Sequence, residues 1–306
     1  MNYQKKIPRT LLYSLIAFSF SWLILLLILL TGIPFGSSLA GILLIVYMFG
    51  PLIASWFVLK VVHRESFKEG IGLSFKINRW FFVSWFIMIF AAFVALGFSV
   101  LMPGVSFSPS MEGFFTKYAD MIQGEQAIEM KKQMLDNKLL FFFLGLAQML
   151  IAGVTINAVA AFGEEAGWRG FLMREMKEKK FFDANLRIGL LWGVWHAPII
   201  AMGHNYPEHP SIGVFMMILW CVLLSFIFGY IRIKAKSVLS SAIIHGTLNA
   251  SAGIPMLYIM GGNDLTVGMT GIAGLITLII LILLIALYDI FISKERIFLS
   301  TMAEKL

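Results

Sequence analysis

Three short segments of this chain place ionisable or amide side chains inside long apolar stretches. In chain order they are Glu164-Glu165-x-x-x-Arg169, Trp192-x-x-x-His196 and His245-x-x-x-Asn249. Ionisable groups in apolar surroundings are costly, so they are functional candidates by default. Glutamate and histidine are the usual general acids and bases, and histidine and asparagine can donate hydrogen bonds to an oxyanion. Together these side chains suit the attack of water on a carbonyl carbon.

Helical spacing gives the members of the first segment different directions. Glu165 and Arg169 are four residues apart, so they share a helical face and can form an ion pair. Glu164 points about 100° away and is left free to face another cavity. An ordinary ion pair at a helix end would give the same local pattern, so this segment alone does not identify a site.

The other two segments each have a structural explanation as well. Trp192 stands one turn before His196, where its ring can pack on the imidazole. Pro198 leaves a backbone carbonyl one turn earlier without its helical donor, and a buried histidine bonded to such a carbonyl would need no catalytic role. His245 and Asn249 share one helical face and could simply join two helices by hydrogen bonds. The chemical argument therefore rests on the three segments together.

The same side chains leave the use of a metal open. Glu164, His196 and His245 could supply the three protein ligands that a catalytic zinc ion normally needs, with Asn249 orienting the carbonyl. They could equally form a metal-free site in which the glutamate is the base. Cys221 is the single cysteine, which excludes an intrachain disulfide and disfavours a zinc-thiolate site.

The elements that must position these residues are membrane-spanning helices. Hydrophobic residues make up 59% of the chain and charged residues 13%, against roughly 45–50% and about 25% in soluble domains. We predict an all-α, polytopic transmembrane helix bundle that forms one transmembrane domain over residues 1–306, with its motif-bearing core at about 140–252. The predicted spans, about eight in number, are 10–31, 39–62, 80–102, 139–162, 186–202, 212–231, 237–260 and 268–292.

The basic residues predict the orientation of the bundle. Twenty of the 24 lysines and arginines lie before the first span, in the second, fourth and sixth connections or within three residues of them, or after the last span. By the positive-inside rule both termini are then cytoplasmic. The connection at about 103–138 is the only long external segment, and 111–135 suits a helix on the membrane surface. The spread of basic residues over several loops argues against nucleic acid as a partner. We expect an integral, multi-pass protein of a bacterial plasma membrane, embedded in the lipid bilayer.

The three segments resemble the three motifs of the CAAX protease and bacteriocin-processing family of intramembrane proteases, also called CPBP or Abi. That pattern is E-E-x-x-x-R, then F-x-x-x-H, then H-x-x-x-N or D, and its order and its placing on hydrophobic helices also fit. The resemblance covers about 140–252. It departs at one position, where Trp192 stands in place of the usual phenylalanine. Because one aromatic residue replaces another, we expect its packing role to survive, beside a narrower pocket at His196.

The resemblance implies an intramembrane endopeptidase that hydrolyses a peptide bond of a protein or peptide substrate near the cytoplasmic leaflet, as CAAX prenyl endopeptidases do. It implies the family's eight-helix bundle with a conical cavity open to the cytoplasmic side. Glu164 and His196 would activate water, and His245 and Asn249 would stabilise the oxyanion or help to hold a metal. The supporting residues would be Glu165, Arg169 and Trp192, with Arg169 a candidate to meet a substrate carboxylate.

The catalytic type stays open between a metallo- and a glutamate-type endopeptidase, although the family is commonly labelled a metalloprotease. The ligands of a metal, if one is used, would be Glu164, His196 and His245, and no sequence feature decides between zinc and no metal. The sequence also does not say whether a substrate is prenylated.

Other classes of protein fit less well. The main alternative is a non-catalytic membrane scaffold, or a bacteriocin immunity or resistance protein of the same family. The presence of every motif position favours an enzyme. No His-Glu-x-x-His motif occurs, and Asp264 and Asp289 stand in the wrong chain order for an aspartyl pair, with Asp264 in an external loop. A transporter would show broken helices paired between two halves, and the sequence has no such symmetry.

Overall fold

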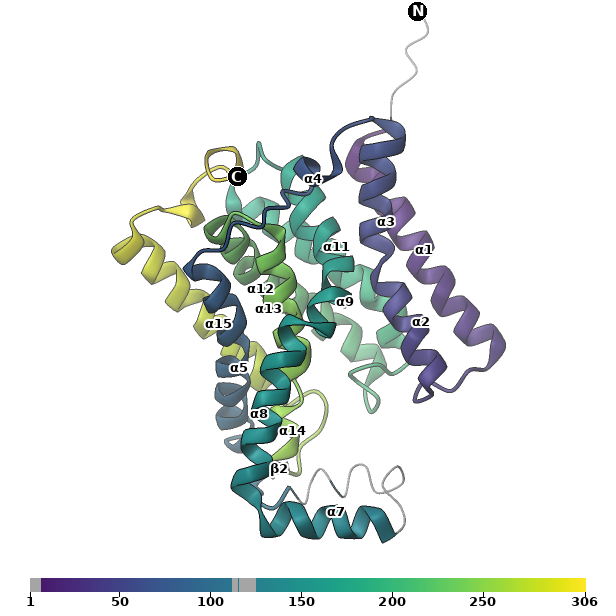
Figure 1. Ribbon diagram of the computed structural model, residues 1–306, viewed down its shortest axis with the longest axis vertical. Helices are drawn as coiled ribbons and strands as arrows, with labels where there is room; N and C mark the ends of the chain where they lie inside the picture. Colours follow the sequence, from purple (N-terminus) through teal and green to yellow (C-terminus); the bar gives the residue numbers. More distant parts are fainter. Residues whose placement is uncertain (1–6, 112–114, 116–124) are drawn as a thin grey trace, which may run out of the picture.

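The computed structural model describes residues 7–111, 115 and 125–306, and over these residues the fold is a bundle of α-helices (Figure 1). Two strands of two residues each, β1 (Ser106–Phe107) and β2 (Ile259–Met260), pair antiparallel. The predicted all-α class is therefore confirmed.

The helices are α1 (Arg9–Thr31), α2 (Ser38–Met48), α3 (Gly50–Trp56), α4 (Phe67–Gly70), α5 (Arg79–Val100), α7 (Glu125–Asp136), α8 (Lys138–Val154), α9 (Ile156–Glu165), α10 (Met173–Glu175), α11 (Phe181–Ala201), α12 (Pro210–Ala235), α13 (Val238–Ser251), α14 (Ile254–Leu257) and α15 (Ile272–Leu287). π-Helical turns η1 (Phe57–Val62), η2 (Ala166–Leu172) and η3 (Tyr288–Ser293) extend three of them, and two 3-10 turns, η4 (Ile297–Leu299) and η5 (Met302–Glu304), follow.

In the described part of the chain, 6 helical segments are long and apolar enough to cross a membrane. They coincide with six of the predicted spans, which confirms a polytopic helix bundle. The segments are Arg9–Thr31, Ser38–Val62, Arg79–Val100, Lys138–Glu175, Pro210–Ala235 and Ile272–Ser293.

The two remaining predicted spans, 186–202 and 237–260, are the helices that carry the motif histidines. α11 has 21 residues, and its first turns include the charged residues Asp183 and Arg187. α13 has 14 residues and ends at Ser251, so it rises only about 21 Å against the ~30 Å of a hydrocarbon core. α11 packs along α12, and α13 packs against α5, α8 and α9. Both helices are thus held by neighbours inside the bundle.

Ion pairs gather the basic connections at one end of the bundle. Arg9, at the start of α1, contacts Glu65 of the second connection at 2.7 Å and Glu175 of the fourth at 3.5 Å. The fourth connection also pairs with the tail, through Lys180 and Thr301. Figure 1 shows α4 and the C-terminus at this end, here called the basic end, and α7 at the opposite end, here called the α7 end. Connections predicted to share one side of the membrane therefore meet, and the assignment of the basic end to the cytoplasm stays a prediction.

The third connection forms part of the α7 end. The surface helix predicted at 111–135 falls partly on residues 112–114 and 116–124, which lie outside the described residues. Within the described part, α7 is helical, and β1 joins this connection to the seventh through its pairing with β2.

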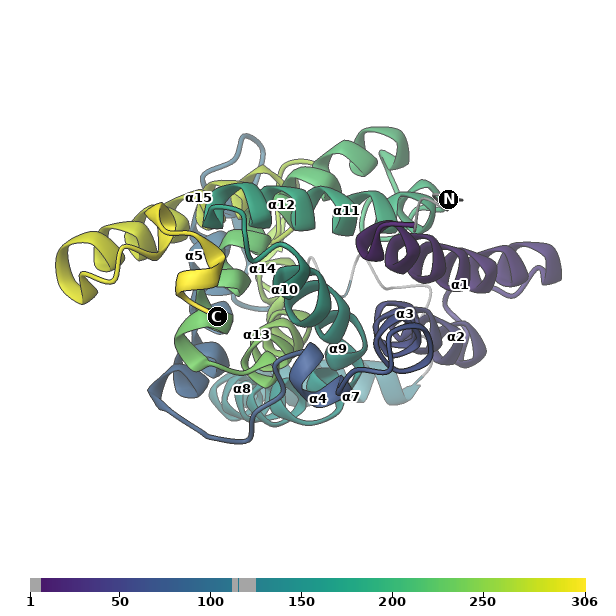
Figure 2. The same cartoon turned by 90° about the horizontal axis from the view of Figure 1, so that it is seen from above.

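Glycines let α11 and α13 approach their neighbours close to the motif histidines. A Cβ at Gly193 would lie 2.6 Å from the Ile218 Cα of α12, and a Cβ at Gly246 would lie 2.5 Å from the Ala158 backbone nitrogen of α9. Small residues allow such close helix contacts in apolar surroundings. In Figure 2, α9 and α13 lie between α1–α3 on one side and α15 on the other. The motif residues are thus carried into the middle of the bundle.

Candidate active site

The first motif lies where α9 ends and a π-helical turn begins. α9 ends at Glu165 and η2 follows, and π-helical turns within helices often occur at functional sites. Glycines bring this turn against α2 and α3. A Cβ at Gly163 would lie 2.8 Å from the Met48 carbonyl oxygen, and a Cβ at Gly167 would lie 2.6 Å from the Pro51 Cβ. This packing leaves both glutamates of the motif buried.

Glu165 joins the first and third motifs through one carboxylate oxygen. Its Oε1 accepts a hydrogen bond from Arg169 Nη1 at 3.0 Å, so the pair expected from helical spacing is present. The same oxygen lies 2.9 Å from His245 Nδ1. Because a carboxylate oxygen accepts, Nδ1 carries the proton, and the Nε2 of His245 is left for another partner.

Arg169 is fully buried, with 0% of its surface exposed. Its Nη2 donates to the Ser225 hydroxyl at 3.0 Å. Its guanidinium carbon lies 4.3 Å from the ring centroid of Trp192 and 5.0 Å from that of Phe228. The resemblance made Arg169 a candidate to meet a substrate carboxylate, but in this arrangement it has no surface open to a substrate. Its contacts hold Glu165 and Trp192 in place instead.

Trp192 lies at the centre of the three motifs. Its indole N–H donates to a Glu164 carboxylate oxygen at 2.7 Å, and its backbone carbonyl lies 2.9 Å from His196 Nδ1. Its ring centroid is 5.7 Å from that of His196 and 5.4 Å from that of His245. A carbonyl can only accept, so Nδ1 of His196 carries the proton and its Nε2 is also left for another partner. Glu164, His196 and His245 therefore surround one indole.

The tryptophan that replaces the family's usual phenylalanine does more than pack. A phenylalanine at Trp192 could keep the ring contacts with both histidines but could not donate a hydrogen bond to Glu164. The indole N–H fixes one oxygen of that carboxylate. The other oxygen has no hydrogen-bond partner among the described residues. The departure from the family pattern thus orients the candidate base.

Two side chains that the sequence analysis missed hold the backbone beside His196. The Tyr47 hydroxyl and the Trp22 indole N–H both donate to the Trp195 carbonyl, at 2.8 Å and 3.0 Å. Pro198 was the available signal, since it removes a helical donor, but it pointed to the carbonyl one residue before Trp195. Local spacing could not identify Tyr47 and Trp22, which come from other helices.

Asn249 lies one turn beyond His245 on α13, on the face that the spacing predicted. It is exposed, whereas His245 is 4% exposed. Within the described part of the chain, the Asn249 amide has no hydrogen-bond partner. Its amide is available for a hydrogen bond, and its role at an oxyanion stays a prediction.

A cavity of about 530 Å³ lies beyond the histidines, toward the α7 end. Its walls include residues 202–205, which follow α11, and Ala252, Gly253 and Met256, which follow α13. Its lining begins six residues past His196 and three residues past Asn249. His204 lines the cavity and is exposed to it.

The position of this cavity makes two expectations from the sequence incompatible with each other. The resemblance implied a cavity open to the cytoplasmic side, whereas the charges predicted that the basic end is cytoplasmic. The cavity lies at the α7 end, away from the ion pairs of Arg9. If substrate reaches the histidines through it, both expectations cannot hold for this protein.

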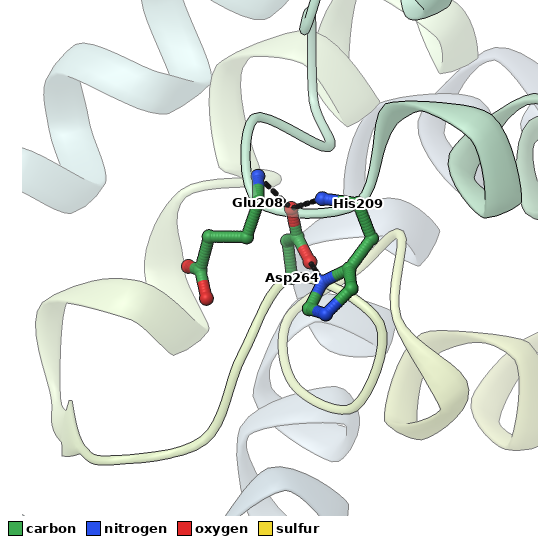
Figure 3. Close-up of side chains that lie close together, drawn as sticks. All are labelled: Glu208, His209 and Asp264. Atoms are coloured by element: carbon green, nitrogen blue, oxygen red, sulfur yellow. Dashed lines mark hydrogen bonds and ion pairs between the residues drawn. The ribbon is translucent and has the colours of Figure 1, made fainter.

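A second cluster of acidic and histidine side chains lies in the loops of the α7 end (Figure 3). Glu208, His209 and Asp264 place one potential ligand atom each within 4.8 Å of one another. Asp264 accepts hydrogen bonds from the backbone N–H of Glu208 at 2.7 Å and of His209 at 3.2 Å, and its Oδ1 lies 2.6 Å from His209 Nδ1. In Figure 3 the Glu208 carboxylate points away from that of Asp264.

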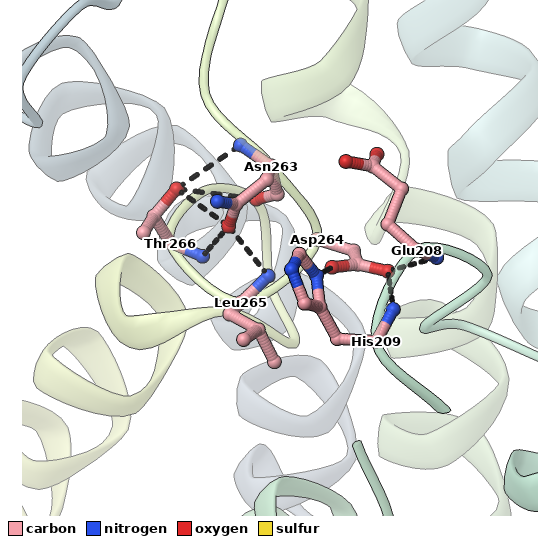
Figure 4. A network of polar contacts seen from close by, with 6 residues as sticks. All are labelled: Glu208, His209, Asn263, Asp264, Leu265 and Thr266. Carbon is pink, nitrogen blue, oxygen red and sulfur yellow. Dashed lines mark hydrogen bonds and ion pairs between the residues drawn. The ribbon is translucent and has the colours of Figure 1, made fainter. Parts of the chain in front are cut away.

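The loop around Asp264 is tied by further hydrogen bonds (Figure 4). The Asn263 side-chain oxygen accepts from the backbone N–H of Leu265 and of Thr266, both at 3.1 Å. The cluster therefore fastens the connection before α12 to the loop before α15. Asp289 follows α15, so the length of that helix, about 24 Å, separates the two aspartates, and they do not form a pair.

The donor set of the motif residues suits a metal as well as a metal-free site. Histidines that bind metals usually donate their second ring N–H to a carboxylate or a carbonyl, as His245 and His196 do here. In the described residues the group with ligand atoms within 4.8 Å of one another is the loop cluster. Glu164, His196 and His245 are less tightly gathered, and their use as metal ligands stays a prediction.

The segment that carries the three motifs is similar to a known protein family. Residues 144–251 match the family described as Type II CAAX prenyl endopeptidase Rce1-like, and this range contains all the predicted site residues. CAAX prenyl protease 2 of Methanococcus maripaludis is 35% identical over 49 residues, which cover 16% of this chain and 18% of the relative. The chain thus matches less than a fifth of that relative's length. The resemblance to the CAAX protease and bacteriocin-processing family is confirmed over the motif-bearing segment.

Proposed function

We propose that this protein is an intramembrane endopeptidase of the CAAX protease type, which uses water to hydrolyse a peptide bond inside the helix bundle. The observation that carries the proposal is the placing of Glu164, His196 and His245 around Trp192, with the Nε2 atoms of both histidines left for other partners. The match of residues 144–251 to the family supports it. A non-catalytic scaffold or immunity protein would not need two histidines whose Nε2 atoms are left without partners.

The water that attacks the substrate carbonyl would lose its proton to Glu164 or to His196 Nε2. The carbonyl oxygen would become an oxyanion near Asn249 and His245, and the proton would pass to the leaving amide nitrogen. Asn249 can donate through its amide. His245 can donate through Nε2 only when both of its ring nitrogens carry a proton.

A divalent metal would change the role of His245. Held by Glu164, His196 and His245, a zinc ion would polarise the carbonyl and favour deprotonation of water. His245 would then have to be neutral at Nε2, because a ligating nitrogen carries no proton. The two catalytic types thus require different protonation states of the same imidazole.

The test is cleavage by purified protein in nanodiscs of quenched fluorescent peptides, with and without a C-terminal S-farnesylcysteine. Glu164→Gln should lower kcat/KM by at least about 100-fold, as expected for loss of a general base. Glu69→Gln removes an exposed carboxylate at the basic end and should leave the rate unchanged. Cleavage retained by Glu164→Gln would reject the catalytic assignment, and absence of cleavage of either peptide class by the wild type would favour the non-catalytic alternative.

We further propose that the basic end faces the cytoplasm, so that the cavity opens toward the other side. Labelling with a membrane-impermeant maleimide in intact cells tests this, because the native Cys221 is fully buried. Asn205→Cys, at the cavity wall, should react in intact cells, and Lys177→Cys only after permeabilisation. The reverse pattern would invert the orientation and place the cavity on the cytoplasmic side, as the family resemblance implied.

A further inference from the structure

A cavity of about 220 Å³ at the basic end is lined mainly by charged side chains. Three are cations, Arg174, Lys177 and Arg232, and one is a carboxylate, Glu178. Within the described residues none of the three cations forms an ion pair. The cavity therefore carries an excess of positive charge that this part of the protein does not neutralise.

Arg232 is the unusual member, because it is only 5% exposed. Its Nη2 donates to the Gly72 carbonyl at 3.3 Å, and its Nε has no hydrogen-bond partner in the described residues. A buried cation is costly unless it is paired. A Cβ at Gly72 would clash with Arg232 Nη2, and Gly72 has a φ of +63°. The backbone is thus shaped to hold this guanidinium where it stands.

A neighbouring cavity of about 480 Å³ is lined by equal numbers of cationic and anionic side chains. It shares Arg174 and Lys177 and adds Arg9, but it is also lined by three carboxylates, Glu65, Glu69 and Glu175. Arg9 pairs with two of these. The larger cavity thus has a carboxylate for each cation, whereas the smaller cavity around Arg232 has one carboxylate for three cations.

We propose that the cavity formed by Arg174, Lys177 and Arg232 binds a phosphate group, namely the headgroup of an anionic phospholipid in the leaflet at the basic end. Guanidinium and ammonium groups are the side chains that recognise phosphate. Basic pockets between membrane helices on the cytoplasmic side bind such headgroups, and the basic connections of this chain meet at this end. The proposal does not depend on peptidase activity.

The test is thermal unfolding of the purified protein in an uncharged maltoside detergent, with three probes. Dioctanoyl phosphatidylglycerol should raise the melting temperature in a saturable way, and dioctanoyl phosphatidylcholine should not. Arg174→Gln/Lys177→Gln, both exposed positions, should weaken the apparent affinity at least about tenfold, the effect of losing one strong interaction. Arg232→Gln should do the same, and the double variant decides the question if Arg232→Gln does not fold.

The matched control is Lys179→Gln/Lys180→Gln, which removes two exposed lysines of the same connection that do not line the cavity. It should keep the affinity of the wild type. Inorganic phosphate separates the sources: stabilisation by phosphatidylglycerol alone identifies a lipid, and equal stabilisation by inorganic phosphate identifies a soluble phosphate ligand at the same site. The proposal is overturned if the control variant loses as much affinity as the cavity variant, or if phosphatidylcholine stabilises equally.

Discussion

The motif centre and the loop cluster are built from the same kinds of side chain but differ in what those side chains have left to offer. In the loop, Asp264 accepts two backbone N–H groups and contacts His209 Nδ1, so its hydrogen-bonding capacity is used within the cluster. In the centre, the Nδ1 atoms of His196 and His245 are fixed by a carbonyl and a carboxylate. Their Nε2 atoms and one carboxylate oxygen of Glu164 have no hydrogen-bond partner among the described residues.

The difference separates a structural cluster from a chemical one. Side chains whose donors and acceptors satisfy one another stabilise a loop, as Asp264 does between two connections. Side chains that are oriented by outside groups, with their reactive atoms unpaired in a buried place, are preorganised for a substrate. Residue type and proximity alone, which favour the loop cluster as a metal site, do not make this distinction.

The contrast between the motif centre and the loop cluster predicts that substitutions of His196 and His209 have different effects on activity. His196→Gln should lower kcat/KM by about 100-fold or more, because it removes the free Nε2 in the centre. His209→Gln, in the loop, should leave kcat/KM within about threefold, an ordinary spread for a remote substitution, and act mainly on stability through its contact with Asp264. Peptide cleavage and melting temperatures of both variants measure this, and an equal loss of activity would place the loop cluster in the reaction.

A second contrast is between buried and exposed arginine pairs. Arg169→Gln should destabilise the protein by about 3–5 kcal/mol, since it leaves the buried Glu165 without its cation. Arg9→Gln removes partly exposed pairs and should change stability by at most about 1 kcal/mol. Unfolding in mixed micelles provides the measurement, and similar losses for the two variants would show that the Glu165–Arg169 pair is no more important than a surface contact.

The Arg9 pair also gives a pH dependence with a definite sign. The hydrogen bond from Arg9 holds the pKa of Glu65 below its ordinary value. Its contribution to stability is present above the unfolded pKa of about 4.3 and is lost as the pH falls through the lowered folded pKa. Arg9→Gln should therefore lower the stability of the protein at neutral pH, and this effect should disappear once the pH is below the folded pKa of Glu65.

Trp192→Phe sharpens the comparison within the centre itself. It keeps the ring beside both histidines and removes only the N–H that donates to Glu164. We expect kcat to fall about tenfold, which corresponds to the loss of one charge-assisted hydrogen bond, with little change in melting temperature. Unchanged kcat would mean that the family's phenylalanine serves as well and that the indole N–H does not orient the base.

Much of this protein is determined by local sequence. The apolar stretches identified the helices, and the spacing of Glu165 and Arg169 identified their ion pair, because residues four apart on a helix are neighbours wherever the helix lies. The spacing also left Glu164 free to face another partner. The number of helices that meet the length of a span was not determined, since α11 and α13 carry the motifs in segments that are more polar or shorter than the rest.

Only the tertiary structure decided which groups meet across helices. The Trp192 indole reaches Glu164 across 28 positions, His245 reaches Glu165 across 80, and Tyr47 reaches the Trp195 carbonyl across 148. Such contacts depend on the rotation and the depth of each helix against its neighbours, which glycine contacts such as those of Gly193 and Gly246 set. Local spacing fixes a face of a helix, but it does not fix what that face meets.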